Sequence, residues 1–522
     1  MAARPRATRR ARERRLKRFA VPLVAIAGAA LAFAFAPFGV WPLAILAPAV
    51  LFFALDEARA DTRPARRGAW LGFAFGVGTF TVGTYWLQIS IHGFGGAPLA
   101  LALALMAALV ALMAAYHALL GAFAARWLPA QGAARYLLGL PAAWTLLEWL
   151  RGFALSGFGW LSLGYSQTDS GLAGLAPLGG MHAISFALAL MAGALVWALR
   201  GGWRTRVLAA LVIALPWVLA TTIGQREFTQ ATAAPVGVAV VQGAIPQDQK
   251  WLDGNRDTTL ARYRALTVEA LGTPIIVWPE SAAPDLANNI IPYLRELAEL
   301  AGRSHSALVI GLIRAEENTR TGALEYFNSV LGLDSEVAWY DKHHLVPFAE
   351  FFPVPQFVRG WLRVLDLPYS DFTPGAVSQP PLQVAGIKLA ASVCYEDAYP
   401  STQRAAVAAS HALVNVTNDA WFGRSSARYQ HLQIARMRAL EAQRYLIRAA
   451  NDGVTAVIGP RGELLVTAPE RVPTVLRAQI IPRSGDTPFL RYGNLPILLL
   501  AAAALLAALV ARRRELSPAS PV

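Results

Sequence analysis

The chain has 522 residues, 55% of them hydrophobic, with a formal net charge of +14 and a single cysteine. This length predicts more than one domain, and the apolar content places part of the chain in a membrane. A single cysteine excludes an internal disulfide, and therefore a small scaffold held together by disulfides. The positive charge could indicate a nucleic-acid partner, so its position along the chain decides how it is interpreted.

The basic residues are concentrated outside the segment 226–486. That segment carries 24 Lys and Arg against 26 Asp and Glu, a net charge of −2, while the remainder carries 23 against 7, a net charge of +16. The surplus clusters at the N-terminus, at Arg512 to Arg514 and in loops between long apolar runs. Such clustering is typical of the cytoplasmic side of a membrane protein. It predicts contact with the lipid bilayer and no nucleic-acid partner.

Long apolar runs fill residues 19–225 and predict seven membrane-spanning helices. Each run is long enough for the roughly 20 residues that cross a bilayer core. The expected fifth span contains Glu148 and Arg151. We interpret these two as a pair that reaches toward the membrane interface, with a role in a transport pathway as the alternative.

A further apolar run predicts an eighth span at 487–511. Residues 1–18 and 512–522 are then basic tails, which the positive-inside rule assigns to the cytoplasm. Seven crossings between the first tail and the segment 226–486 put that segment on the outer side of the membrane. The sequence thus predicts a polytopic α-helical membrane bundle of about eight spans with an extramembrane domain inserted before the last one.

The segment 226–486 has the pattern of an α/β domain. Short β-rich runs such as "PIIVWPE" and "ALVIGLI" alternate with helix-like stretches such as "IIPYLRELAELAG". Polar residues follow three of the expected strands, in "VWPES", "YDKHHLVPFAE" and "SVCYED". In α/β domains functional residues gather where strands end in loops, so these three blocks are the candidate site.

The three blocks supply a thiol, a carboxylate and an ammonium group. Cys394 needs a base or a cation nearby, because only the thiolate is a strong nucleophile and a free thiol has a pKa of about 8.5. Glu280 can act as that base, and Lys342 can stabilise an oxyanion. No zinc-binding motif is present, and we expect neither a metal nor a cofactor.

In this order, each at the end of an expected strand, the three blocks resemble the signature blocks of the nitrilase, or carbon–nitrogen hydrolase, superfamily. The resemblance covers about 236–483, and "VQGAIPQDQKW" and "VTNDAWFG" extend it. Combined with the spans on both sides, the chain resembles the apolipoprotein N-acyltransferases, a bacterial inner-membrane family that completes lipoprotein maturation. The resemblance implies a nitrilase-like αββα sandwich in the extramembrane α/β domain.

The resemblance also assigns roles to residues. It implies that Cys394 is the nucleophile, Glu280 the general base and Lys342 the cation that supports the tetrahedral intermediate. Glu350 would orient the lysine or assist proton transfer, and the backbone N–H of Tyr395 would complete the oxyanion hole. Glu396 would be a further supporting carboxylate. Three aromatic residues would either contact lipid or pack within loops: Trp251, Trp421 and Phe422.

The implied reaction is ping-pong. A phospholipid, typically phosphatidylethanolamine, would donate an acyl chain to Cys394 as a thioester, and the α-amine of a diacylated apolipoprotein would then accept it. The resemblance implies a multi-pass inner-membrane protein with a periplasmic catalytic domain, cytoplasmic N- and C-termini, and a monomeric state.

Two other classes of function remain open on the sequence. A membrane-tethered amidase or nitrilase would use the same three residues with water as acceptor, but a hydrolase of soluble substrates needs no seven-span bundle. A transporter or scaffold with an outer binding domain predicts paired charges along the spans, which contain almost none.

Overall fold

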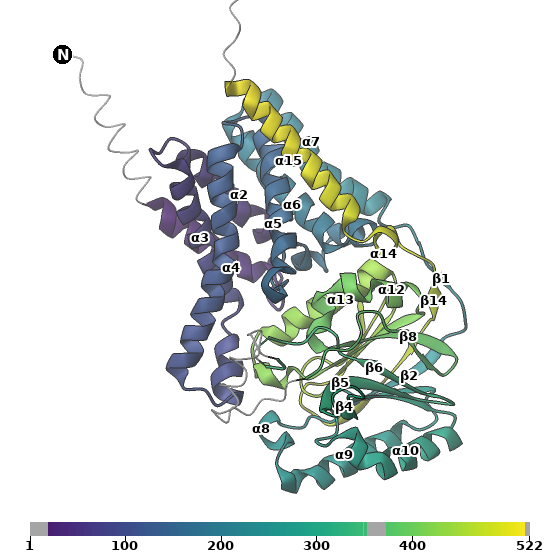
Figure 1. The fold of residues 1–522 in the computed structure, drawn as a ribbon. Helices are drawn as coiled ribbons and strands as arrows, with labels where there is room; N and C mark the ends of the chain where they lie inside the picture. The colour runs from purple at the N-terminus through teal and green to yellow at the C-terminus, as the bar shows by residue number, and fades with distance from the viewer. Residues whose placement is uncertain (1–18, 348, 352–371, 517–522) are drawn as a thin grey trace, which may run out of the picture. The chain divides into compact units, whose positions relative to one another are not determined.

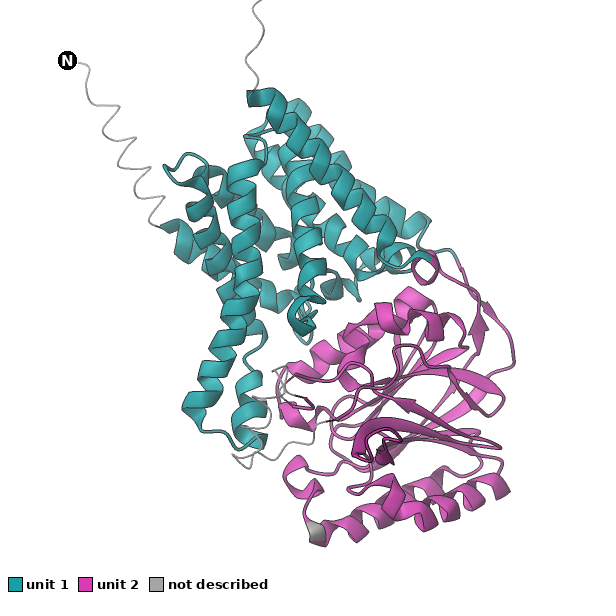
Figure 2. Ribbon diagram, in the orientation of Figure 1, with its two compact units in different colours: residues 1–226, 492–522 teal, residues 227–491 magenta. Residues whose placement is uncertain are grey.

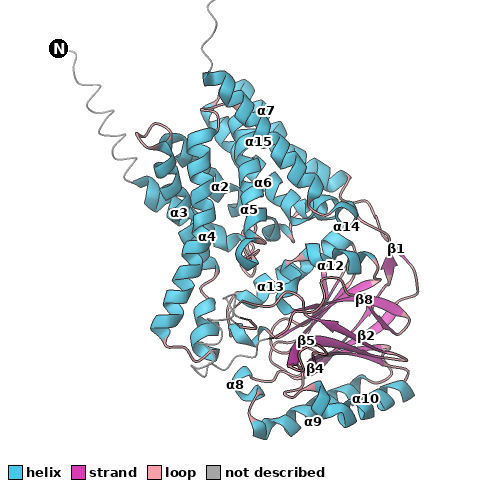
Figure 3. Cartoon of the chain, in the orientation of Figure 1, coloured by secondary structure: helices cyan, strands magenta, loops and turns pink. Residues whose placement is uncertain are grey.

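The protein is described by a computed structural model for residues 19–347, 349–351 and 372–516. The chain forms two compact units (Figure 2). Unit 1 comprises 1–226 and 492–522, and unit 2 comprises 227–491. Unit 1 is helical, whereas unit 2 combines strands with helices (Figure 3).

The helices of unit 1 follow the apolar runs of the sequence. They are an N-terminal helix at Phe19–Ala34, α2 (Leu43–Ala58), α3 (Pro64–Gly83), α4 (Leu99–Trp127), α5 (Leu140–Arg151), α6 (Ala176–Arg200), α7 (Trp203–Thr222) and α15 (Leu495–Leu516). Short 3₁₀ or π turns are η1 (Ala32–Ala34), η2 (Ile89–Phe94), η3 (Ala134–Gly139), η4 (Ala154–Ser156), η5 (Leu163–Gln167) and η6 (Gly171–Leu175). The short helix α14 (Pro488–Tyr492) precedes α15.

Among the described residues, four helices are long and apolar enough to cross a bilayer: α4, the segment Gly171–Arg200 that includes α6, α7, and α15. Two of the others are shorter, since α2 has 16 residues and α5 has 12, whereas α3 has 20 residues but is not among the four. At a rise of about 1.5 Å per residue, α5 alone covers less than the thickness of a bilayer core. The chain is a membrane protein, and the count of about eight spans stays a prediction.

Glycines let α3 and α4 pack with their backbones in contact. A Cβ atom added at Gly72 would lie 1.9 Å from the carbonyl oxygen of His117, and one at Gly121 would lie 2.0 Å from that of Gly68. Neither position has room for a side chain. Small residues at helix contacts are the usual way for helices to associate closely where lipid removes the hydrophobic drive.

The interpretation of Glu148 and Arg151 as a pair reaching toward the interface is wrong. Their exposed fractions are 7% and 3%. Helix α5 ends at Arg151, whose guanidinium turns to the following loop and donates to the carbonyl of Phe158 (2.6 Å) and the hydroxyl of Ser162 (2.9 Å). Glu148 accepts from the backbone N–H of Leu163 at 3.0 Å. Both charges therefore hold an irregular loop that could not satisfy its own polar groups.

Unit 2 contains two six-stranded sheets. The first has the order β13-β2-β3-β4-β5-β6 and the second β12-β11-β10-β9-β8-β7. The strands of the first are β2 (Val236–Gln242), β3 (Ile275–Val277), β4 (Ala307–Glu317), β5 (Leu324–Leu333), β6 (Val337–Asp341) and β13 (Thr474–Ile480). Those of the second are β7 (Leu382–Val384), β8 (Ile387–Val393), β9 (Ala412–Thr417), β10 (Leu446–Ala450), β11 (Ala456–Ile458) and β12 (Leu464–Thr467). A small ladder joins β1 (Gln230–Ala231) to β14 (Arg483–Ser484).

Alternation along β2 shows how the layers form. Val238 and Val240 point into a core shared with the second sheet, while Ala239 and Val241 belong to a core that includes helices. Successive side chains of a strand point to opposite faces, so a strand that is apolar throughout must be covered on both faces. This is why the run "VGVAVV" is hydrophobic without interruption.

Helices cover both outer faces of the paired sheets (Figure 1). Helices α9 (Arg256–Ala270) and α10 (Ile291–Arg303) pack on the first sheet, and α12 (Pro400–Ala408) and α13 (Ala427–Ala442) pack on the second. The central core is formed by the inner faces of both sheets. The predicted αββα sandwich is confirmed for unit 2.

The sheet directions bring the candidate blocks to common edges. Strands β3 and β4 are parallel, while β5 is antiparallel to both β4 and β6, so β6 runs in the same direction as β3. The carboxyl ends of β3 and β6 therefore lie at one edge of the first sheet. In the second sheet β8, β9 and β10 are parallel, so their carboxyl ends share an edge as well.

Candidate active site

The three sequence blocks meet in unit 2. Glu280 follows β3 by three residues, and Lys342 and Cys394 are the first residues after β6 and β8. The exposed fractions are 8% for Glu280 and 1% for Lys342, and Cys394 is partly buried. All three side chains are thus wholly or partly shielded from water, and all three follow the end of a strand. The sequence predicted this position for functional residues of an α/β domain.

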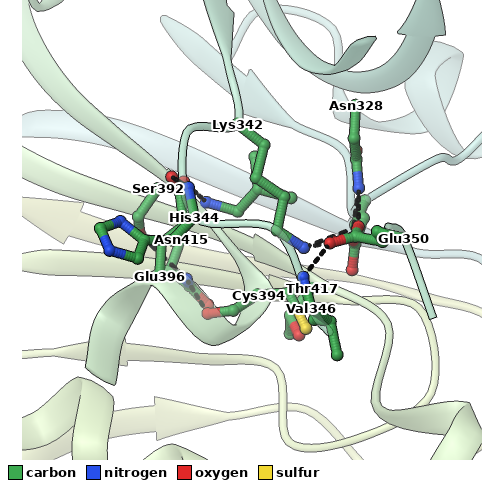
Figure 4. A network of polar contacts seen from close by, with 12 residues as sticks. Asn328, Lys342, His344, Val346, Glu350, Ser392, Cys394, Glu396, Asn415 and Thr417 are labelled. Atoms are coloured by element: carbon green, nitrogen blue, oxygen red, sulfur yellow. Dashed lines mark hydrogen bonds and ion pairs between the residues drawn. The ribbon is translucent and has the colours of Figure 1, made fainter. Parts of the chain in front are cut away.

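Lys342 is held between two carboxylates. Its Nζ lies 2.8 Å from Oε1 of Glu350, as Figure 4 shows. The same Nζ lies 3.8 Å from Oε1 of Glu280. Burial alone would lower the pKa of Lys342, but the charges of Glu350 and then Glu280 outweigh it, so the pKa is raised and the ammonium group stays protonated. The prediction that Glu350 orients the lysine agrees with this contact.

Asn328 is a site residue that the sequence analysis missed. It lies on β5, and its Nδ2 donates to Oε1 of Glu280 (2.8 Å) and to Oε1 of Glu350 (3.0 Å). Glu350 also accepts the backbone N–H of Val346 at 2.8 Å. One amide thus fixes the spacing of two like charges. Its only signal in the sequence was a lone asparagine within the apolar strand "YFNSVLGL".

The thiol of Cys394 is in its neutral form. Burial raises its pKa, the charge of Glu280 raises it further, and Lys342 opposes both without reversing them. The side chain of Thr417 also contacts the thiol. A thiol that stays protonated must lose its proton during the reaction, and Glu280 is the carboxylate whose charge acts most strongly on it. These effects on the pKa fit a thiol that a general base deprotonates during the reaction, rather than one that is already a thiolate in the resting enzyme.

The backbone of Cys394 is held in an uncommon conformation. Its φ is +53°, in the left-handed region that side chains with a Cβ disfavour. The carbonyl of Cys394 accepts hydrogen bonds from Nε2 of His431 (3.0 Å) and Nδ2 of Asn415 (3.3 Å). Strain of this kind persists only where surrounding contacts over-determine the backbone, and it is frequent at active sites. Neither His431 nor Asn415 was among the predicted residues.

Glu396 accepts hydrogen bonds from residues on both sides of Lys342 and from the end of β8. Its Oε1 accepts the backbone N–H groups of His343 (2.8 Å) and His344 (3.1 Å), and its Oε2 accepts the hydroxyl of Tyr340 (2.9 Å) and the N–H of Val393 (2.8 Å). These contacts tie the end of β8 to the end of β6. The arrangement suits a supporting residue that positions Lys342 relative to Cys394.

Tyr395 packs its ring against Tyr399 with centroids 5.0 Å apart, and the two hydroxyl groups are hydrogen-bonded. Tyr399 in turn stacks on His344, with centroids 4.1 Å apart. Burial lowers the pKa of His344 to about 4, and the neighbouring His343 and Lys342 add to the effect. His344 is therefore a neutral ring that packs against Tyr399.

Two of the three candidate aromatic residues are well exposed. The exposed fractions of Trp251 and Trp421 are 47% and 39%, and Phe422 is partly buried. Trp251 follows α8 (Gln247–Lys250), and Trp421 and Phe422 lie in the turn η10 (Asp419–Phe422). Their exposure is compatible with lipid contact, which stays a prediction.

Lys250 is a second buried lysine beside Glu280. It is 1% exposed, and its Nζ donates to the backbone carbonyl of Glu280 at 3.4 Å. Burial lowers the pKa of Lys250 to about 8, although the charge of Glu280 acts in the opposite direction. Lys250 lies in the stretch "VQGAIPQDQKW", where no local pattern marks it as a site residue.

Together, the αββα fold and the converging thiol, carboxylate and ammonium group define a domain of the carbon–nitrogen hydrolase class. Residues 237–487 match the family model "Carbon-nitrogen hydrolase", and residues 27–194 match "Apolipoprotein N-acyltransferase N-terminal domain". The chain is 41% identical to an apolipoprotein N-acyltransferase of Azotobacter vinelandii, over 96% of each chain. It is 39% identical to one of Pseudomonas putida, over 94% of this chain and 96% of the relative.

The chain belongs to the apolipoprotein N-acyltransferase family, which confirms the resemblance seen in the sequence. The family and the apolar helices indicate an inner-membrane protein. Among solved structures, the NitFhit protein of C. elegans matches with 20% identity and a TM-score of 0.36, over 50% of this chain and 63% of that one.

Proposed function

We propose that the protein transfers an acyl chain from a membrane phospholipid to the α-amine of the N-terminal diacylglyceryl-cysteine of apolipoproteins, through a thioester on Cys394. The observation that carries this proposal is the convergence of Cys394, Glu280 and Lys342 within one domain of a member of this family. Phosphatidylethanolamine is the proposed donor, and the monomer is the proposed active form.

In the first half-reaction Glu280 takes the proton of the Cys394 thiol as Sγ attacks the carbonyl carbon of the phospholipid ester. The carbonyl electron pair moves to oxygen, where the charge of Lys342 and the backbone N–H of Tyr395 stabilise it. The tetrahedral intermediate collapses as its C–O bond to the glycerol breaks. Glu280 returns its proton to the leaving alkoxide, and a lysophospholipid departs from the acyl-enzyme.

In the second half-reaction the amine of the apolipoprotein attacks the thioester carbonyl. Glu280 removes a proton from the attacking nitrogen, the C–S bond breaks, and the sulfur leaves as a thiolate that recovers the proton. An amide remains on the lipoprotein. Because Glu280 accepts and returns one proton in each half-reaction, a single carboxylate serves both.

The membrane unit has a physical reason in this scheme. Both substrates are anchored in the bilayer by long acyl chains, and exposing them to water costs about 0.8 kcal/mol for each CH₂ group. An enzyme embedded in the same bilayer avoids that cost. A membrane-tethered hydrolase of soluble substrates would gain nothing from it.

The acyl-enzyme is the test of this function. Purified protein incubated with a fluorescent phospholipid is expected to carry label that hydroxylamine removes, and Cys394→Ala is expected to carry none. A diacylated lipopeptide should then take up the label as an amide. Label that persists in Cys394→Ala shows that another group carries the acyl chain. Label that passes to water at the same rate with and without lipopeptide identifies a hydrolase instead.

For the topology we propose about eight spans, cytoplasmic termini and a periplasmic catalytic domain, supported by the charge distribution along the chain. Cysteines introduced singly at Asp61 and Ser335 of a Cys394→Ala protein test it. In intact spheroplasts a membrane-impermeant thiol reagent should label the cysteine at 335 and leave that at 61 unlabelled. The reverse pattern would put the site in the cytoplasm, away from exported lipoproteins.

A further inference from the structure

The peptide group between Cys394 and Tyr395 is held from one side by two buried side chains. Nε2 of His431 lies 3.0 Å and Nδ2 of Asn415 lies 3.3 Å from the carbonyl oxygen of Cys394. The exposed fractions of these side chains are 1% and 0%. His431 comes from α13 and Asn415 from β9, so two different elements fix one carbonyl.

The orientation of that carbonyl determines the orientation of the next N–H group. A peptide unit is planar and trans, so its C=O and N–H bonds point in opposite directions. Fixing the carbonyl of Cys394 toward His431 and Asn415 therefore aims the N–H of Tyr395 to the opposite side. This N–H is the backbone donor that the proposed mechanism assigns to the oxyanion.

A second layer of charge fixes the two donors in turn. Nδ1 of His431 lies 2.8 Å from Oδ1 of Asp419, and Arg448 donates to Oδ2 of Asp419 (2.9 Å) and to Oδ1 of Asn415 (2.7 Å). His431 and Arg448 hold the pKa of Asp419 below its usual value in spite of burial, so Asp419 accepts hydrogen bonds and donates none. The two ring nitrogens of His431 thus face two oxygen atoms, those of Asp419 and of the Cys394 carbonyl.

The arrangement also strengthens the N–H of Tyr395 as a donor. Hydrogen bonds that share a peptide group polarise one another, and a carbonyl that accepts two donors makes the N–H of the same unit more positive. The contact from Nε2 of His431 is the shorter of the two, at 3.0 Å against 3.3 Å. The network of His431, Asn415, Asp419 and Arg448 therefore acts on the oxyanion through the main chain, while the charge of Asp419 also raises the pKa of the Cys394 thiol.

We infer that His431 and Asn415 are positioning residues that orient the Cys394–Tyr395 peptide so that its N–H faces the oxyanion in both half-reactions. The inference rests on the proposed acyl transfer through Cys394. It assigns a role in the reaction to two residues outside the three signature blocks. Through the carbonyl of Cys394 they set the direction of the N–H group that faces the oxyanion.

Three rates separate this role from a general structural one. They are acylation of the enzyme by fluorescent phospholipid, transfer from the isolated acyl-enzyme to a lipopeptide, and alkylation of Cys394 by iodoacetamide. Both acyl-transfer steps pass through an oxyanion. Alkylation displaces iodide at a saturated carbon and forms none, so it reports the thiol and Glu280 without the oxyanion hole.

Asn415→Asp and His431→Leu are the test variants. Asn415→Asp keeps the shape and the acceptor for Arg448 but removes the donor to the carbonyl of Cys394. Each variant is expected to slow both acyl-transfer steps by about 10- to 100-fold, less than loss of an oxyanion donor itself. Alkylation should stay within about twofold of the wild-type rate. His431→Gln keeps a side-chain N–H and should recover part of the loss.

Arg436→Met is the matched control, because Arg436 donates from the same helix to a backbone carbonyl, that of Gly462 (2.6 Å), away from Cys394. All three of its rates should equal those of the wild type. Wild-type acyl transfer in both test variants, or alkylation slowed as much as acyl transfer, overturns the inference. Failure of the wild-type protein itself to form acyl-Cys394 overturns the proposed function, and this inference with it.

Discussion

The two units bury charged side chains in different ways. In unit 1 Arg135 pairs with Asp56 at 2.8 Å and donates to the carbonyls of Ala124 (3.0 Å) and Pro129 (3.2 Å). Asp56 also accepts the hydroxyl of Tyr136 at 2.6 Å. Nε of Arg200 lies 3.6 Å from Oδ2 of the same carboxylate, so two cations face Asp56. The arrangement joins residues far apart in the chain and contains no thiol.

In unit 2 one ammonium group faces two carboxylates and a thiol. Lys342 lies between Glu350 and Glu280, Lys250 is buried beside Glu280, and the thiol remains protonated. A buried cluster of titratable groups with shifted pKa values is typical of functional sites. The comparison teaches that a buried ion pair by itself indicates architecture, whereas buried charges gathered beside a nucleophile indicate reaction.

The largest effect is expected for Glu280→Gln, which removes the base and leaves the shape. General-base catalysis contributes typically 10²–10⁴-fold, and the neutral thiol leaves no alternative path, so we expect a loss near about 10⁴-fold in the rate of acyl-enzyme formation. Iodoacetamide alkylation should slow as well. The control is Glu299→Gln, a surface glutamate paired with Arg303 on α10. Normal acylation in Glu280→Gln would assign the base elsewhere.

Lys342→Met comes next. Removal of one oxyanion contact costs about 2.7–4 kcal/mol, or about 10²–10³ in kcat. Because the contact is strongest in the transition state, kcat should fall while KM for phospholipid changes little. Lys388→Met, at an exposed lysine on β8, is the matched control. A raised KM with unchanged kcat would make Lys342 a ligand for the phospholipid headgroup.

Glu350→Gln should have a smaller effect, because Glu350 acts on Lys342 and not on the thiol. Its Oε1 holds the ammonium group at 2.8 Å and its Oε2 accepts the N–H of Val346. A glutamine keeps one of these contacts, so we expect kcat to fall by about 10- to 100-fold. Single-turnover acylation measures it. A loss equal to that of Glu280→Gln would mean that the two carboxylates share the role of base.

Arg135→Met tests the other side of the comparison. Breaking a buried ion pair from one side costs about 3–5 kcal/mol, so the yield of folded protein and its thermal midpoint should fall. The kcat of each folded molecule should not change, since this pair lies in unit 1 and takes no part in the chemistry. Arg126→Met, at an exposed position in the last turn of α4, should alter neither quantity. A fall in kcat with normal stability would show that the unit 1 pair is functional.

The smallest effect is expected for His344→Phe, and it depends on pH. The ring stacks on Tyr399, and its buried Nδ1 makes no hydrogen bond, so phenylalanine should replace it at little cost. The pKa of His344 is about 4 in the folded protein and 6.5 in the unfolded chain. As the pH falls, the unfolded chain therefore binds the proton first. Wild-type stability at this residue is full above pH 6.5 and is lost as the pH falls toward 4.

The His344→Phe variant lacks this loss of stability. The difference between its thermal midpoint and that of the wild type should therefore increase as the pH falls from 6.5 to 4, by about 2–4 °C for each kcal/mol of stability that the wild type loses. A difference in midpoint that does not vary with pH would show that His344 is not held neutral in the folded protein.

Much of the site could be predicted because its residues stand in short local patterns. Glu280, Lys342 and Cys394 each follow an apolar β-rich run, and the resemblance of these blocks to a known family named their roles before any distance was known. Asn328, Asn415 and His431 could not be found in this way. Their side chains reach the site across sheets or from a helix, and nothing in their own neighbourhoods marks them.

The sequence by itself determined the alternation of membrane and α/β segments, because hydrophobic runs and β-rich strands are local patterns of burial. It also predicted which three groups react, and the structure brings these residues into one domain. Only the tertiary structure decided that Glu148 and Arg151 are buried and hold a loop, and that two carboxylates share one lysine through Asn328. It alone decided that the carbonyl of Cys394 is fixed by residues 21 and 37 positions away. The physical reason is that hydrogen bonds and charge balance depend on which strand ends are neighbours in the fold, and local sequence patterns do not specify this.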